Sequence, residues 1–183
     1  MRTRLRTSLI MALACTFGVS LAGQKVTNTG TGGGGSPHVK AEWMIDGAAI
    51  RIEYGRPSLK GRPEAQMMPA GQPWRTGADE ATTITSSKPL TFGSLKLEAN
   101  TPYTINTVPG DTQWQIVFGK LAKAGQWGVP YQAALELGKV PMAVAKTTTP
   151  VEQLTISIDD TAPGATLRIE WGTVSASVPF TVG

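Results

Sequence analysis

The 183-residue sequence has one cysteine and one histidine, and these two shortages exclude several kinds of chemistry. Cys15 lies in an N-terminal segment that we expect to be removed, so the mature chain has no thiol for a disulfide, a nucleophile or a metal. A serine–histidine–aspartate relay would have to use His38, which borders a glycine-rich segment and is poorly placed for catalysis. We therefore predict no catalytic residue, no cofactor and no metal site.

The sequence also lacks an apolar run of the length that spans a membrane. The apolar segment 9–22 is too short, and it follows the basic residues Arg2, Arg4 and Arg6. This order is typical of a secretory signal peptide, which we place at 1–22 with cleavage before Gly23. We expect an exported protein, periplasmic or extracellular, without a transmembrane helix in the mature chain. Lipid attachment at Cys15 is the alternative.

Runs of lysine and arginine are absent as well. The formal net charge is +4, from 17 basic and 13 acidic residues. Three of the basic residues are the leader arginines, so the mature chain has 14 basic against 13 acidic residues, a net charge of +1. Nothing remains that would neutralise a row of phosphates, and we expect no nucleic acid among the partners.

Glycine is plentiful, most notably in residues 30–36, which are all glycine or serine except for Thr31. Such a tract behaves as a flexible coil, and we predict a flexible linker over residues 23–37. The folded domain is expected at residues 38–183, a length that suits one hydrophobic core.

Within that domain, alternation of apolar and polar residues predicts strands rather than helices. Asp46 and Gly47 separate the first two alternating runs and predict a hairpin turn. Segment 131–138 is left open, either as a short helical piece or as an irregular loop. About nine to ten strands predict an all-β fold, an antiparallel β-sandwich or flattened barrel. The strands are expected near residues 39–43, 50–54, 81–86, 95–97, 103–108, 114–118, 140–145, 154–158, 167–171 and 174–180.

The long connection expected between residues 55 and 83 is the strongest candidate for a binding site, because long loops often carry function. Its arginines would grip a carboxylate, and its tryptophan offers a flat apolar face. The same charges also suit internal fastening, with Arg75 paired to Asp79 or Glu80. The candidate ligand-binding residues are Arg56, Arg62, Trp74, Arg75, Asp79 and Glu80.

Adjacent carboxylates support a second hypothesis, a hydrolase of envelope polymers. Asp79 or Glu80 would act as acid or base, but neighbouring side chains diverge along a strand. A second carboxyl group, from Glu53 or Glu170, would have to complete the pair.

The chain also contains a set of motifs that occur together in one family, namely Tyr54 to Pro57, Lys60 to Arg62, Trp74 to Thr83, Leu97 to Tyr103, Gln126 to Gly128, Glu170 to Trp171 and Val178 to Phe180. With these motifs the chain resembles the DUF2911 family of exported bacterial proteins of unknown function. The resemblance covers nearly everything after residue 37, and it implies an exported β-rich domain without supplying an activity. In two places the chain departs from the family pattern, which has Asn where Asp79 stands and Gly where Asn100 stands.

Taken together, the sequence predicts a non-enzymatic domain of the cell envelope that binds a small anionic or sugar-like ligand, or a partner. The carboxylate-dependent hydrolase is kept as the alternative. Nothing in the sequence indicates an oligomeric state.

Overall fold

The computed structural model describes residues 23–122 and 131–183, and within them it contains one sheet of ten antiparallel strands. The strand order is β1-β2-β3-β4-β7-β8-β9-β10-β5-β6, so β1 and β6 are edges and the sheet does not close into a barrel. The prediction of an all-β antiparallel fold is confirmed. The expected signal peptide, Cys15 and Gln126 to Gly128 lie outside the described residues.

The strands differ greatly in length, from three residues to 25. Two short helical pieces interrupt them, the α-helix α1 (Glu64–Met67) and the 3-10 helix η1 (Ala133–Leu135). The strands are β1 (Lys25–Thr31), β2 (Pro37–Ile45), β3 (Ala48–Gly55), β4 (Thr83–Ser86), β5 (Leu90–Phe92), β6 (Leu95–Leu97), β7 (Tyr103–Val108), β8 (Gln113–Lys120), β9 (Glu136–Asp160) and β10 (Ala165–Val182).

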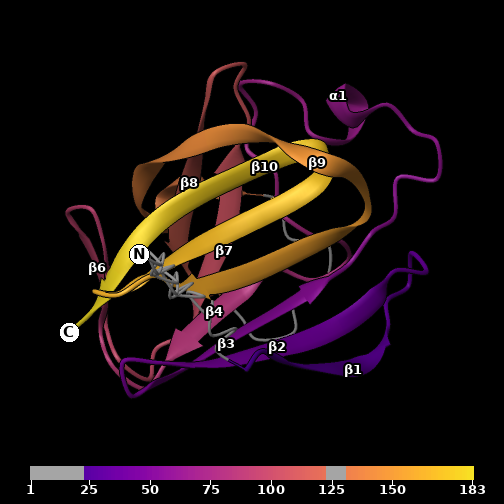
Figure 1. Ribbon diagram of the computed structural model, residues 1–183. Helices are drawn as coiled ribbons and strands as arrows, with labels where there is room; N and C mark the ends of the chain where they lie inside the picture. The colour runs from indigo at the N-terminus through magenta and orange to yellow at the C-terminus, as the bar shows by residue number, and fades with distance from the viewer. Residues whose placement is uncertain (1–22, 123–130) are drawn as a thin grey trace, which may run out of the picture.

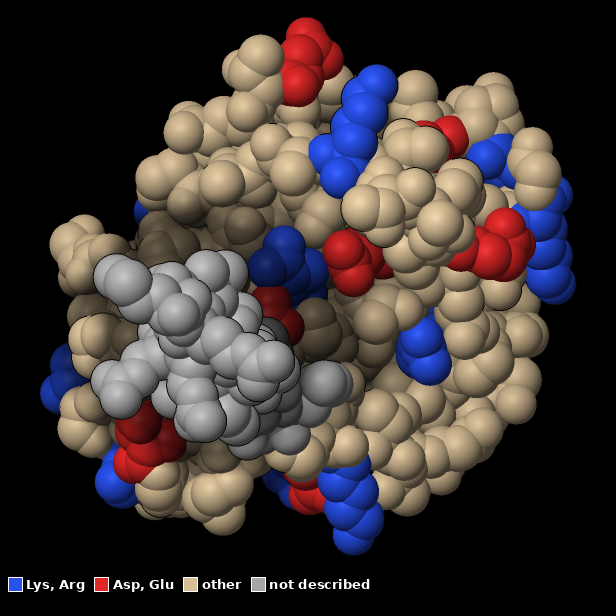
Figure 2. Space-filling model, viewed as in Figure 1, with Lys and Arg blue, Asp and Glu red and all other residues tan. Residues whose placement is uncertain are grey.

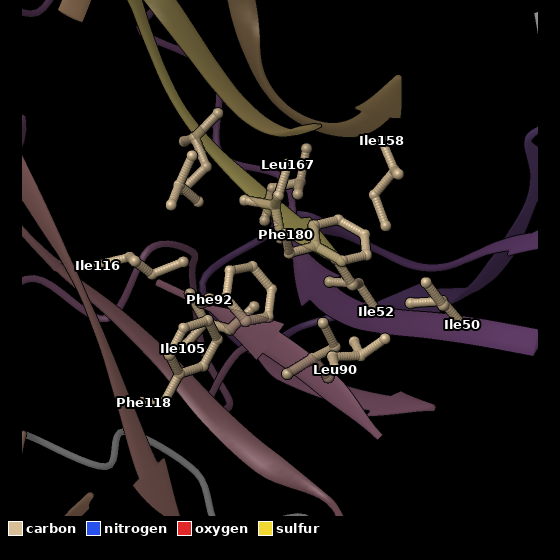
Figure 3. Close-up of a cluster of buried hydrophobic side chains, with 14 of the residues drawn as sticks. Ile50, Ile52, Leu90, Phe92, Ile105, Ile116, Phe118, Ile158, Leu167 and Phe180 are labelled. Atoms are coloured by element: carbon tan, nitrogen blue, oxygen red, sulfur yellow. The ribbon is translucent and has the colours of Figure 1, made fainter. Parts of the chain in front are cut away.

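The sheet curls so that one face encloses the core. In Figure 1 the long strands β9 and β10 cross in front of β7 and β8, and β9 also contacts β2. Figure 3 shows the centre of this core, where apolar side chains from both halves of the curled sheet point toward one another. They include Ile50, Ile52, Leu90, Phe92, Ile105, Ile116, Phe118, Ile158, Leu167 and Phe180.

Alternation in the sequence places these side chains inward. In β3 the residues Ile50, Ile52 and Tyr54 are buried and the residues between them are exposed. Asp46 and Gly47 both have positive φ angles, 47° and 72°, as a tight hairpin turn requires. The predicted pairing of the first two alternating runs is therefore confirmed as β2 with β3.

The last third of the chain differs from the prediction in strand count. The two runs expected at 140–145 and 154–158 belong to the single strand β9, and the last two runs belong to β10. The register of β9 with β10 shifts on both sides of Gly172, whose φ is 61°. This irregularity bends the strands without ending them, because the pairing resumes beyond it. Segment 131–138 contains both η1 and the start of β9.

Residues 23–37 also differ from the flexible linker that composition indicates. Residues Lys25–Thr31 form β1, which pairs with β2, and the glycine-rich tract is the turn between these strands. Gly32 N donates to Ser36 O, and Gly35 N donates to Gly32 O, both at 2.9 Å. Strand pairing therefore extends the ordered part of the chain upstream of His38.

Within the described part of the chain, no helix has the length and apolar character to cross a membrane.

Candidate functional site

The predicted long connection is present between β3 and β4 and is fastened at several points. Leu59 N donates to Glu152 O, and Leu154 N donates to Pro57 O, so the first part is bonded to β9. Farther on, Trp74 and Thr107 of β7 exchange two backbone hydrogen bonds of 2.7 and 2.8 Å. The connection is therefore laid down on the sheet as a fixed structure.

The helix α1 within this connection is held by one carboxylate. Glu64 Oε1 accepts a hydrogen bond of 2.8 Å from Thr173 N, and Glu64 Oε2 lies 3.1 Å from Thr173 Oγ1. Thr173 follows Gly172, at the bend in β10, so the bend and the helix are joined through Glu64.

A groove of about 770 Å³ lies between this connection and the glycine-rich turn. Its walls come from the turn at Gly34 to Pro37, from the connection between Pro57 and Asp79, and from two aromatic residues, Tyr131 and Trp171. Four of the six predicted ligand-binding residues line it, namely Arg62, Trp74, Arg75 and Asp79. Arg56 and Glu80 do not.

Arg56 holds the connection to β9. Its Nε donates to Leu154 O at 3.0 Å, and its Nη2 donates to Thr155 Oγ1 at 2.9 Å. These hydrogen bonds attach the connection to β9. Arg56 therefore has the structural role that was the alternative to ligand binding for the charged residues of this loop.

Arg62 is exposed and donates to its own loop, from Nε to Leu59 O at 2.9 Å and from Nη2 to Ser58 O at 2.5 Å. Lys60 also lines the groove. Among the described residues neither side chain has a carboxylate within ion-pair distance, so both contribute positive charge to the groove.

Arg75 is half-buried, and it is not the ion-pair partner of Asp79 or Glu80 that the structural interpretation expected. In the described ranges its one hydrogen bond is a long one, 3.4 Å from Nε to Gly77 O. Its two terminal nitrogens have no hydrogen bond to any described residue. A half-buried guanidinium with such sparse contacts is a natural point for an anion to bind.

Trp74 is the aromatic surface of the groove. Its ring stacks on Trp171, with centroids 5.6 Å apart and planes 13° from parallel. Trp171 is buried, with 1% of its surface exposed, and its Nε1 donates to Glu152 O at 3.1 Å. Trp74 is thus held by its backbone on one strand and by its ring on another, which preorganises its position.

His38 lies between the two acidic residues that sequence analysis singled out. Its Nε2 lies 3.0 Å from Oδ2 of Asp79, and because a carboxylate only accepts, the ring nitrogen donates. Its Nδ1 lies 2.8 Å from Oε2 of Glu80, within ion-pair distance but not aligned as a hydrogen bond. Asp79 and Glu80 thus approach one imidazole from two sides, although neighbours on a regular strand would diverge.

The backbone of Asp79 explains that arrangement. Its φ angle is 64°, in the left-handed region that Asp and Asn tolerate better than most residues, so strand alternation does not apply. Asp79 is buried, with 5% of its surface exposed, and its Oδ1 accepts a hydrogen bond of 2.9 Å from Gly34 N. The carboxylate therefore holds the glycine-rich turn against the long connection.

The pKa of Asp79 is lowered by its neighbours. Burial, the largest single influence, acts to raise this pKa, but it is outweighed by the hydrogen bonds from His38 and Gly34 and by the positive charges of His38 and Arg75. Asp79 is thus held as a carboxylate. A general acid needs the opposite shift.

No group of three or more His, Cys, Asp or Glu residues in ranges 23–122 and 131–183 is arranged to hold a metal ion. On the face drawn in Figure 2, basic and acidic side chains are interspersed and form no large patch of one sign.

Sequence reasoning missed His38, Lys60 and Trp171 as parts of this region. His38 borders a glycine-rich tract whose composition predicts a coil, which makes it a poor candidate from sequence. In the structure, Gly34 of this tract and His38 both bond to Asp79. Trp171 alternates with Leu167 and Ile169 and therefore indicates a core position, which it also occupies. Only the tertiary structure brings Lys60 and Trp171 to the groove and His38 to Asp79.

No curated protein and no solved structure matches the chain at a significant level. One family model does match, over residues 36–180, and it is described as a protein of unknown function, DUF2911. The match begins at the last residue of the glycine-rich tract and ends in β10, so it includes the groove-lining residues from Ser36 onward but not Gly34 and Gly35. The chain belongs to the DUF2911 family.

Proposed function

We propose that this protein is an exported, non-enzymatic domain of the cell envelope that binds a small anionic or sugar-like ligand in the groove beside Trp74. One observation supports this most directly. Lys60, Arg62 and Arg75 line one groove without an ion-pair partner among the described residues, next to a rigidly held tryptophan. Unpaired cations around an aromatic surface suit an anion attached to an apolar or sugar body.

The hydrolase alternative receives less support. Asp79 is kept ionised, its two oxygens are hydrogen-bonded to Gly34 and His38, and Glu80 lies against the other side of the same imidazole. This arrangement stabilises a turn, and the lowered pKa of Asp79 is the opposite of what a general acid needs to protonate a leaving group.

Ligand binding is tested by thermal unfolding of the purified protein with citrate, glucuronate and glucose at constant ionic strength. Binding to the folded state stabilises it by RT ln(1 + L/Kd), where L is the free ligand concentration, so the melting temperature rises as the ligand concentration exceeds Kd. We expect citrate or glucuronate to raise it for the wild type and not for Arg75→Gln. Arg51→Gln is the matched control, because Arg51 is exposed on β3 outside the groove. If none of the three compounds changes the melting temperature, the proposed function is wrong.

Export is tested separately, by expressing the full chain in a bacterium. The cytoplasmic, membrane, periplasmic and extracellular fractions are separated, and the molecular mass of the protein in each is measured by mass spectrometry. We expect the mature form to start at Gly23 and to appear outside the cytoplasm. A full-length protein that stays in the cytoplasm would contradict the export part of the proposal, and an added lipid mass on Cys15 would favour the anchored alternative.

A further inference from the structure

We infer that the groove takes an acidic oligosaccharide, with a carboxylate on Arg75 and a sugar ring against Trp74. This inference rests on the proposed function and names its ligand class.

The backbone of the glycine-rich turn argues for a ligand that is bound by side chains. Phosphate sites commonly use free amide groups of a glycine-rich loop. In this turn the amides of Gly32, Gly34 and Gly35 donate to Ser36 O, Asp79 Oδ1 and Gly32 O respectively. The Asp79 carboxylate, which also lines the groove, repels a doubly charged group. The groove therefore favours carboxylate groups, each of which carries a single charge, over a phosphate.

Arg75 is the residue best placed to bind that carboxylate. Arg56 lies outside the groove and its Nε and Nη2 are both used, and Arg62 uses the same two nitrogens for its own loop. Arg75 uses only Nε, so both terminal nitrogens remain available with respect to the described residues. Two parallel N–H groups on one guanidinium match the two oxygens of a carboxylate.

Trp74 adds the second element of recognition. Trp171 covers one face of its ring, and the half-buried Trp74 lines the groove. A flat ring fixed in this way buries the apolar C–H face of a sugar at little cost in side-chain entropy, because the indole is already ordered. A simple anion such as citrate offers no such face.

The size of the groove favours more than one sugar unit. Its volume of about 770 Å³ lies in the upper part of the roughly 300–1,000 Å³ range of small-molecule pockets. Lys60 and Arg62 line it in addition to Arg75, so more than one acidic unit would meet positive charge.

The experiment is calorimetric titration of the purified protein with trigalacturonate, galacturonate, maltotriose and citrate at one ionic strength. We expect trigalacturonate to bind at least tenfold more tightly than each of the other three. Arg75→Gln and Trp74→Leu should each weaken trigalacturonate binding at least tenfold, and Trp74→Tyr should retain most of it. Arg51→Gln, outside the groove, should bind as the wild type does.

The outcomes separate the two proposals. Citrate binding as tightly as trigalacturonate, with no effect of Trp74→Leu, would show an anion site without sugar recognition, which overturns this inference and leaves the proposed function standing. If maltotriose binds as tightly as trigalacturonate, the inference that the oligosaccharide is acidic is wrong. If no probe binds and none raises the melting temperature, both proposals fail. If Trp74→Leu does not fold, Trp74→Tyr and Trp74→His replace it as the test. If both of these variants bind trigalacturonate no more tightly than they bind citrate, the proposed contact between a sugar ring and Trp74 is wrong.

Discussion

Gly34 N and Oδ1 of Asp79 are 2.9 Å apart, and this hydrogen bond joins the turn after β1 to the connection before β4. Two segments that are 45 residues apart in the sequence are thereby joined side by side where they line one groove. Because Asp79 also accepts a hydrogen bond from His38, a single buried carboxylate determines how the groove is closed on this side.

Removing this carboxylate should destabilise the fold. We expect Asp79→Ala to lower the free energy of unfolding by about 3 kcal/mol, because His38 and Gly34 both lose their acceptor in a buried place. Asp79→Asn should cost less, about 1 kcal/mol, since asparagine keeps an acceptor and tolerates the same backbone angle. Urea unfolding measures both. Asp111→Asn, on an exposed turn, is the control and should change the free energy of unfolding little. If Asp79→Asn and Asp111→Asn lower the free energy of unfolding equally, the structural role of Asp79 is wrong.

The lowered pKa of Asp79 also predicts how stability depends on pH. In the unfolded chain an Asp has a pKa of about 3.9, and in the folded protein this one titrates at lower pH. Between the two values the unfolded state binds more protons, so stability falls as the pH falls from about 4 through the folded pKa. Urea unfolding from pH 7 to pH 2 should show a steeper loss for the wild type than for Asp79→Asn. Parallel curves below pH 4 would contradict this.

His38 should be needed because it separates two carboxylates. We expect His38→Leu to destabilise the protein by about 3 kcal/mol, since it removes the donor to Asp79 and leaves Glu80 beside an apolar group. Adding Glu80→Gln and Asp79→Asn to His38→Leu should restore part of the loss, because the charges no longer face each other. A triple variant less stable than His38→Leu would show that charge is not the reason.

The contact between α1 and the bend of β10 predicts a non-additive pair of substitutions. A Cβ on Gly172 would collide with the carboxylate of Glu64, and the φ of 61° is unfavourable for alanine. Gly172→Ala should cost about 2 kcal/mol. In the Glu64→Ala background the same substitution should cost less, because only the backbone strain remains. Unfolding free energies of the four proteins measure the coupling, and strict additivity would contradict it.

Much of the fold is predictable because alternation records which face of each strand is buried. Residues Ile50, Ile52 and Tyr54 show this in β3, and Asp46 and Gly47 indicate the hairpin. The three-residue strand β5 was not predicted, although the equally short β6 was, because three residues give too little alternation for a dependable prediction. β1 was missed because Thr, Asn and Gly at an exposed edge lack the apolar alternation of a core strand.

The candidate site was predictable in location but not in connectivity. The long connection and its Arg62, Trp74 and Arg75 line the groove. The partner of Asp79 was not predictable, because composition describes the glycine-rich tract as a coil and cannot show that Gly34 and His38 return to it. The left-handed angle of Asp79, like that of Asn100, follows from a local backbone that only a three-dimensional structure reveals.

The position of β1 has a mechanical consequence. Among the strands of residues 23–122 and 131–183, this one pairs with β2 alone, and its pairs run from Lys25 with Glu42 to Thr31 with Pro37. A force applied upstream of Lys25 would break these pairs one at a time, starting at the end remote from the glycine-rich turn. Tension at that end would separate the strand progressively and reach Gly34 last, so the side of the groove that Gly34 lines is the part of the hairpin best shielded from a pull on the N-terminal side.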